Sequence, residues 1–316
     1  MATPEPLDAV DLTGLPVASP IGFMAALGLL RVLAQDHGWP VRLSWPGACA
    51  RLHGIGRGAV VEALLAHMAG RSRAPEFNFP VAGEGGRETP VTHLRTLTPA
   101  DYRAAAAAFA GDTRALAFLA GYGTDAVVDD DGCIARTRLD FTSGQQKLMH
   151  ELRALAAVLD PQARRPAVPL VTRVERALFG GPYEQQSSFG WDASALRVHA
   201  HEPEPPAETP PPGQPMTVWL AAEALPLHPV LPAEPRRANT AGFLQGRAYV
   251  WPQWRAPLSL AEVALLRQRP VASLDALPGV AGVWASTVTS VGKYGFLLPA
   301  ARTPSVAALR ERFARR

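Results

Sequence analysis

The chain has 316 residues, of which 47% are hydrophobic and 19% are charged, so it can bury a large core in one or two domains. Its 31 basic and 28 acidic residues give a formal net charge of +3, which permits nucleic-acid binding but provides no polycationic tail. Cys49 and Cys133 lack the spacing of a zinc site or a disulfide framework. The apolar stretch 21–33 is too short to span a membrane. We therefore expect a cytoplasmic protein with no membrane contact and no cofactor.

Helix-start signals and apolar alternation predict the helices and strands of the first 142 residues. Ser19 and Pro20 supply an N-cap and a proline at the first helical position, which predicts a buried helix over residues 21–35. Further helices are predicted over residues 58–68, 99–110 and 112–119, and strands over residues 41–45, 126–128 and 133–141. The Asp131-Gly132 step predicts a tight hairpin between the last two strands.

The segment 134–147 is the most informative part of the sequence. Its alternation predicts a half-buried strand that presents Arg136, Arg138 and Asp140 on one exposed face. Ser143 and Gln146 then form a capping-box pattern, which predicts that a helix begins there. Free N–H groups at such a start favour an anion. The alternative is a capped core helix with a solvated first turn.

Residues 202–215 hold seven prolines and three glutamates, a composition typical of an extended surface insertion. They divide an α/β domain over residues 1–201 from an α/β portion over residues 216–316, which the sequence allows to be continuous with the first. In that portion we expect a strand or buried segment over residues 216–222, a helix over residues 259–267, and strands over residues 248–251, 282–288 and 294–298. The predicted fold is mixed α/β, with antiparallel or mixed sheets, packed helices and a Pro-rich surface insertion.

Residue types that bind nucleic acid recur in several loops, whereas no catalytic motif is present. Arginine and lysine neutralise phosphates, glutamine and asparagine read base edges, and tyrosine stacks on an unpaired base. The predicted contact residues are Arg136, Arg138, Thr142, Ser143, Gln145, Gln146, Lys147, Arg236, Arg237, Asn239, Lys293 and Tyr294. Trp251 and Trp254 form either a stacking platform or a buried pair. His199 and His201 would face the same way on a strand and could bind a metal.

Five segments together resemble a family encoded in type I-G, formerly I-U, CRISPR loci. The resemblance covers about residues 10 to 270. These segments are Leu12-Thr13-Gly14-Leu15, residues 19–31, residues 140–147, Phe189-Gly190-Trp191-Asp192 and residues 249–259. Two stretches depart from the family pattern, namely residues 197–201, which replace a basic, tyrosine-containing run, and residues 220–226, which lack an aromatic residue and a glycine.

The resemblance implies a non-enzymatic, large-subunit-like component of a Cascade surveillance complex. Guide RNA would read the target sequence, and this chain would contact the PAM duplex, the displaced strand or the guide end. The implied partners are guide RNA, double-stranded target DNA, a repeating backbone subunit, a guide-end-binding subunit and a recruited helicase-nuclease. Two alternatives remain open, a metal-dependent nuclease or guide-RNA processing enzyme that uses His199 and His201, and a protein-only scaffold.

Overall fold

The computed structural model describes residues 8–83, 87–142, 146–162, 167–193, 212–234, 236–291 and 294–314. The helices are α1 (Pro20–Arg31), α2 (Arg57–His67), α3 (Pro75–Asn78), α4 (Pro99–Ala108), α5 (Thr113–Tyr122), α6 (Leu148–Val158), α7 (Leu170–Phe179), α9 (Pro215–Glu223), α10 (Leu260–Gln268) and α11 (Val306–Ala314). The first strands are β1 (Ala9–Pro16), β2 (Arg42–Ser44), β3 (Cys49–His53), β4 (Pro80–Ala82), β5 (Glu88–Pro90), β6 (Gly123–Val128), β7 (Ile134–Arg136) and β8 (Glu184–Gln185). The later strands are β9 (Pro212–Gly213), β10 (Val230–Glu234), β11 (Arg237–Thr240), β12 (Phe243–Leu244), β13 (Ala248–Trp254), β14 (Val280–Val291), β15 (Tyr294–Leu297) and β16 (Ala301–Thr303).

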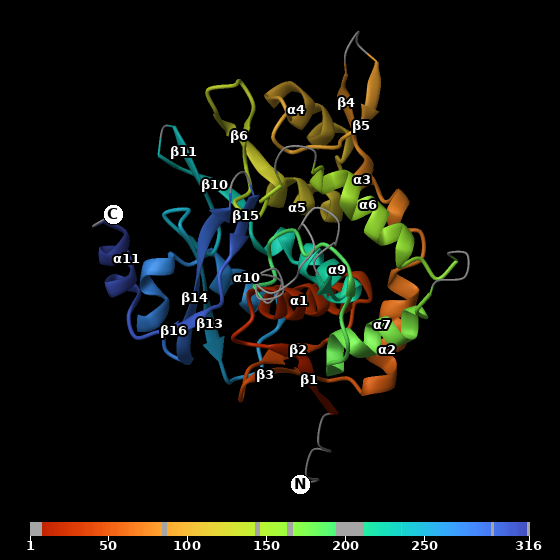
Figure 1. Cartoon of the computed structure of the whole chain (residues 1–316), viewed down its shortest axis with the longest axis vertical. Coiled ribbons are helices and arrows are strands. Elements are labelled where there is room, and N and C mark those ends of the chain that lie inside the picture. The colour runs from red at the N-terminus through yellow and green to blue at the C-terminus, as the bar shows by residue number, and fades with distance from the viewer. Residues whose placement is uncertain are drawn as a thin grey trace, which may run out of the picture.

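The fold is mixed α/β, as predicted, and every strand pairing within the described residues is antiparallel. A three-stranded sheet has the order β1-β3-β2, and a larger sheet has the order β12-β13-β14-β15, with β16 also paired to β14. Helices α1 and α9 lie at the centre of the molecule, and α2 and α7 lie on the side away from the larger sheet (Figure 1). None of the helices in the described residues is long and apolar enough to cross a membrane.

Helix α1 is the centre of the core, because every one of its residues is buried. Its start is as predicted: the Ser19 hydroxyl accepts a hydrogen bond from the Gly22 N–H at 3.1 Å, and Pro20 occupies the first turn. Helix α9 is also buried along its whole length and packs directly on α1. The two helices approach so closely at Gly28 that a Cβ there would lie 1.8 Å from the Leu220 carbonyl oxygen. Only a residue without a side chain allows this crossing.

Aromatic residues of β13 join the two sheets to α1. The Phe23 ring stacks on both Trp45 and Trp251 with ring centroids 5.6 Å apart. The Trp251 indole N–H donates to the Val17 carbonyl at 2.9 Å, and the Trp254 indole N–H donates to the Leu43 carbonyl at 2.8 Å. Both indoles are therefore satisfied core groups, which confirms the buried pair and excludes the exposed stacking platform.

Local signals in the sequence account for several further elements. Thr98, Asp112 and Ser259 cap α4, α5 and α10 through their side chains, and Ser259 forms a full capping box with Glu262. Strands β6 and β7 form the expected hairpin, with Gly132 at a φ of +80°. These predictions succeed because each depends on contacts within a few residues.

Residues 216–222 are buried, as expected, but they belong to helix α9 and not to a strand. An apolar run this short has no period that separates a buried strand from a buried helix. Pro215, at the first position of α9, fixes a helical φ and lacks an N–H that the helix start would leave unpaired.

One hydrophobic cluster extends from Val10 in β1 to Leu297 in β15, so side chains from both sides of the Pro-rich segment share it. A smaller cluster lies between β13, β14 and α11. Residues 202–211 lie outside the described residues, whereas Pro212 and Gly213 form β9 and pair with β8. The end of the predicted insertion is therefore part of the folded structure.

His228 lies in this core, and the hydrogen-bond partners of its two ring nitrogens indicate which nitrogen carries the proton. Nδ1 is 2.8 Å from the Ala224 carbonyl oxygen and Nε2 is 2.7 Å from the Tyr249 hydroxyl oxygen. A neutral ring that donates from Nδ1 and accepts at Nε2 fits both contacts. Burial, with the charge of Arg267, lowers the pKa of His228 well below its usual 6.5.

We expect the free energy of unfolding to decrease as the pH falls below 6.5, because the unfolded chain then binds a proton that folded His228 excludes. Above pH 6.5 this contribution is constant, and below it the loss from this residue is at most about 1.4 kcal/mol per pH unit. His228→Gln should flatten the pH dependence of the urea midpoint, whereas the same substitution at the exposed His150 should leave it unchanged. An equal slope in all three proteins would contradict this account.

Candidate nucleic-acid interface

The predicted strand over residues 134–141 is shorter than expected, because β7 ends at Arg136. The chain then turns, and the Asp140 N–H donates to the Thr137 carbonyl at 3.2 Å. Asp140 is therefore 7% exposed and does not share the exposed face of the arginines. Its carboxylate accepts hydrogen bonds from the N–H and hydroxyl of Thr142, a local turn that competes with strand pairing.

The same turn fixes the two arginines. The Arg136 guanidinium donates to the Asp140 carboxylate at 3.3 Å. Arg138 is held by β11 and by the turn before β13: its backbone N–H donates to Thr240 Oγ1 at 2.8 Å, and its guanidinium donates to the Gly246 carbonyl at 2.9 Å. The alternation in the sequence thus correctly predicts an exposed Arg138, although the strand itself does not continue.

Helix α6 begins later than the capping-box pattern predicts. Its first residue is Leu148, and Lys147 is its N-cap with no side-chain capping bond. Only the reciprocal contact of a capping box is present, because the Glu151 carboxylate accepts a hydrogen bond from the Lys147 backbone N–H at 3.3 Å. Gln146 therefore precedes the helix and is not its third residue, while Ser143 and Gln145 lie outside the described residues.

Two segments more than 140 residues apart in sequence form the walls of one groove. The groove has a volume of about 630 Å³. One wall consists of Arg136, Thr137, Arg138, Asp140, Phe141 and Thr142, and the other consists of Val288, Thr289, Ser290 and Gly295. The structure thus brings together three predicted contact residues, Arg136, Arg138 and Thr142, with the β14–β15 hairpin.

Phe141 and the Phe-Gly-Trp-Asp segment hold these walls together. The Phe141 ring lies between Gly190 and Gly295, where added Cβ atoms would approach it to 3.2 and 2.9 Å. The Trp191 indole N–H donates to the Leu139 carbonyl, and the Leu297 N–H donates to the Gly190 carbonyl, both at 2.8 Å. The position of the groove therefore depends on two glycines that leave room for one ring.

The other predicted contact residues lie around the groove or outside the described part of the chain. Arg237, at the start of β11, is 78% exposed and only 3.8 Å from Glu234, and its neighbour Arg236 is also exposed. Asn239 is turned inward and donates to the Phe243 carbonyl at 3.3 Å. Strands β10 and β11 pack against β6, so these residues belong to the same end of the molecule as the groove (Figure 1). Lys293 lies outside the described residues, and Tyr294 begins β15.

Sequence reasoning missed several residues beside the predicted ones. Thr289 and Ser290 line the groove, and the only signal for them is their position before Lys293 in a Gly-containing loop. His93 and Arg95 lie near Lys147, and no spacing in the sequence indicates it. Burial lowers the pKa of His93, as do the positive charges of Arg95 and Lys147. His93 thus adds no positive charge to this surface at neutral pH.

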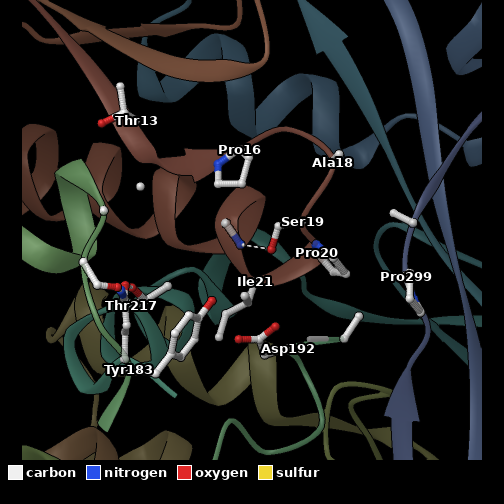
Figure 2. A pocket seen from close by; sticks show the side chains of 17 residues that line it. Thr13, Pro16, Ala18, Ser19, Pro20, Ile21, Tyr183, Asp192, Thr217 and Pro299 are labelled. Atoms are coloured by element: carbon white, nitrogen blue, oxygen red, sulfur yellow. Dashed lines mark hydrogen bonds between the residues drawn. The ribbon is translucent and has the colours of Figure 1, made fainter. Parts of the chain in front are cut away.

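A second hollow of about 430 Å³ opens at the start of α1 (Figure 2). Its labelled wall residues include Thr13, Ser19, Tyr183, Asp192 and Thr217. None of its described lining residues is basic, and one is acidic. This hollow is therefore less suited to a phosphate backbone than the groove with two arginines.

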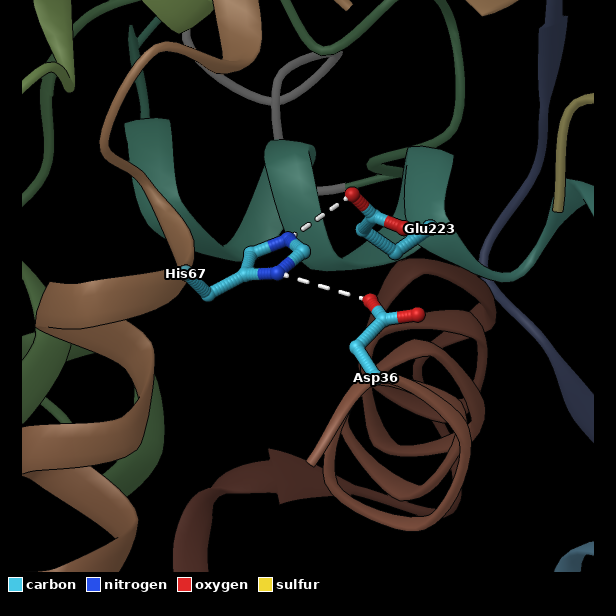
Figure 3. Close-up of side chains that lie close together, drawn as sticks. All are labelled: Asp36, His67 and Glu223. Atoms are coloured by element: carbon cyan, nitrogen blue, oxygen red, sulfur yellow. Dashed lines mark hydrogen bonds and ion pairs between the residues drawn. The ribbon is translucent and has the colours of Figure 1, made fainter. Parts of the chain in front are cut away.

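A third group of chemically notable residues is a charge cluster in which Arg31, His67, Glu76 and Glu223 are buried, Arg71 and Arg114 are partly buried and Asp36 is exposed. Asp36, His67 and Glu223 face one another from the end of the π-helical turn Val32–Asp36 that follows α1, the end of α2 and the end of α9 (Figure 3). The His67 Nε2 lies 2.9 Å from the Glu223 carboxylate, and its Nδ1 lies 3.5 Å from that of Asp36. Such an arrangement of one imidazole and two carboxylates is compatible with a metal site.

The charges of the cluster do not favour a metal. Three arginines and three carboxylates already balance one another within it. Arg114 donates to both Glu223 oxygens, at 2.8 and 2.7 Å, and Arg31 donates to the same carboxylate. Burial alone would raise the pKa of Glu223, but Arg114 and Arg31 hold it well below its usual range. A divalent cation would have to displace these arginines, so we interpret the cluster as structural.

A comparison of the chain with models of known protein families finds no match, and a search of curated proteins finds none either. The groove and the charge cluster are therefore interpreted from their own residues. Of these two, only the groove combines accessible positive charge with space for a ligand.

Proposed function

We propose that the chain is a non-enzymatic subunit of a type I CRISPR Cascade complex that contacts nucleic acid through the groove between residues 136–142 and the wall formed by residues 288–290 and Gly295. The observation that carries the proposal is that three residues predicted to contact nucleic acid, Arg136, Arg138 and Thr142, line one groove opposite a wall of β14 and β15 that has no acidic residue among its described lining residues. Guide RNA, double-stranded target DNA, the other Cascade subunits and a recruited helicase-nuclease are its proposed partners.

The structural relation between the resembling segments supports the proposal. Residues 140–142 and Phe189-Gly190-Trp191-Asp192 pack together at the groove, and residues 19–31 and 249–254 form the centre of the core. Four of the five resembling segments therefore form two connected parts of the structure, the centre of the core and one wall of the groove. In this role Arg136 and Arg138 bind backbone phosphates, and Gln146 and Lys147 contact DNA near the PAM.

The direct test is reconstitution with the other proteins of the locus and a guide RNA. Target-duplex binding is measured with and without this chain, across a randomised PAM. We expect binding and PAM selection to require the chain. A complex that assembles and selects targets equally well without it would favour a scaffold or enzyme role. The histidines of the nuclease alternative, His199 and His201, lie outside the described residues.

Replacing Arg138 with glutamine should weaken target binding by the reconstituted complex similarly for all sequences. The substitution removes the charge but keeps a donor for the Gly246 carbonyl. We expect the slope of log affinity against log salt to become shallower by about 1. The matched control is Arg42→Gln on β2, where Arg42 pairs with Glu262 at 3.1 Å and lies at the other end of the molecule (Figure 1). Equal slopes for the two variants would contradict the assignment of Arg138 to a phosphate.

A further inference from the structure

The size of the groove restricts what it can enclose. A volume of about 630 Å³ is typical of a site for one small molecule or a short piece of chain. A duplex is too large to enter such a site, since the major groove of B-DNA alone is about 12 Å wide. Duplex DNA could therefore touch only the rim, whereas an unpaired strand could place a nucleotide between the walls.

The charge within the groove is incompletely compensated. Asp140 is the only acidic residue among its described lining residues, and its carboxylate is occupied by Arg136 and Thr142. The Arg138 guanidinium forms its hydrogen bond with a neutral carbonyl, and within the described residues it pairs with no carboxylate. Although Arg138 is exposed, partial desolvation of its guanidinium, together with the neighbouring charge of Arg136, lowers the pKa of Arg138. An anion bound here would offset both effects.

The opposite wall adds neutral groups that suit a nucleotide. Side chains of β14 alternate between the two faces of the strand, so Ser290, whose register partner Gly295 lies against Phe141, presents its hydroxyl to the groove. This hydroxyl can donate to a phosphate oxygen and can also accept from a sugar or base group. No described residue on this wall is acidic, so nothing there competes for Arg138. The half-buried Phe141 ring supplies an apolar surface at the groove, and bases pack favourably on such rings.

We propose that this groove binds an unpaired segment of nucleic acid, with a phosphate on Arg138 and the adjoining nucleotide between Phe141 and the hydroxyl of Ser290. This inference rests on the proposed function and specifies its ligand. Single-stranded DNA and RNA share the required chemistry, and the experiment below separates them. Duplex DNA is the competing ligand.

The test measures binding of the full chain by fluorescence anisotropy. The probes are single-stranded DNA and single-stranded RNA of about ten nucleotides, a length within the usual site size, and a blunt duplex of the same sequence. We expect at least one single strand to bind about tenfold tighter than the duplex, and the stronger of the two identifies the sugar. Arg138→Gln should weaken that binding about tenfold, the effect of losing one charge-assisted contact.

Ser290→Ala provides a second variant that removes only a hydroxyl from the groove face of β14. It should weaken single-strand binding severalfold, while Thr89→Val in the exposed strand β5 and Arg42→Gln should not. Tighter duplex binding, or single-strand binding unaffected by both groove variants, would overturn the inference and leave the proposed function standing. Failure of the chain and of its reconstituted complex to bind any probe would overturn both.

Discussion

Glu223→Gln is expected to lower the free energy of unfolding by about 3–5 kcal/mol, the usual consequence of removing one partner from a buried ion pair. The Glu223 carboxylate is fully buried and accepts from Arg31, Arg114 and His67. A neutral amide would leave the three arginines of the cluster with only two carboxylates, and Arg31, which is 1% exposed, would keep only Asp36 at 3.9 Å. The expected loss of stability is large because the arginines of the cluster remain charged after the substitution, whereas the intact ion pairs add little net stability.

Urea unfolding followed by circular dichroism measures this loss. The matched control is Glu175→Gln, since Glu175 is 48% exposed and pairs with Arg57 at 3.4 Å in an otherwise similar carboxylate–arginine contact. That change should cost no more than about 0.5 kcal/mol. If both substitutions shift the urea midpoint equally, the cluster does not have the structural importance assigned to it.

Gly28→Ala should destabilise the protein by at least about 3 kcal/mol, the upper end of the range for overpacking. The added methyl group would lie 1.8 Å from the Leu220 carbonyl oxygen and 2.8 Å from its carbon, and neither atom belongs to a flexible side chain. Helices α1 and α9 would have to separate, which would open the centre of the core.

The control is the same substitution in another helix. Gly58 lies in the first turn of α2, and a Cβ there would meet no atom within 4 Å. Gly58→Ala should raise the stability by about 0.5–1 kcal/mol, because alanine restricts the unfolded chain and favours a helix. Thermal melting of the two variants therefore gives shifts of opposite sign, and a small or positive shift for Gly28→Ala would contradict the close crossing.

These contrasts show which parts of the structure the sequence could predict. The sequence could indicate several helix caps, because a capping contact joins residues that are only three positions apart. These caps are Ser19, Thr98, Asp112 and Ser259. The pattern of Ser143 and Gln146 is the same kind of local signal, but it predicted the wrong first residue for α6. Lys147 occupies the N-cap of this helix, and the Glu151 carboxylate accepts a hydrogen bond from the Lys147 N–H. A local signal predicts a helix here but not which of several nearby residues begins it.

The groove and the charge cluster depend on contacts that no local pattern contains. Alternation indicated that Arg136 and Arg138 lie together, but only the fit of Phe141 between Gly190 and Gly295 brings the β14–β15 hairpin opposite them. The cluster joins Arg31 to Glu223 across 192 residues of sequence. Its members occur singly, so composition and spacing give no indication that they meet.

The central position of α1 matters during protein synthesis, because residues that bury this helix are made much later than the helix itself. This helix is synthesised well before α9 and β13, which supply surfaces that bury it, and the Val17–Trp251 contact spans 234 residues. At the usual rate of translation the ribosome needs roughly ten to fifty seconds to make that interval. During this time an apolar helix lacks its native partners on those faces, so the nascent chain should depend on holding chaperones until α9 and β13 emerge.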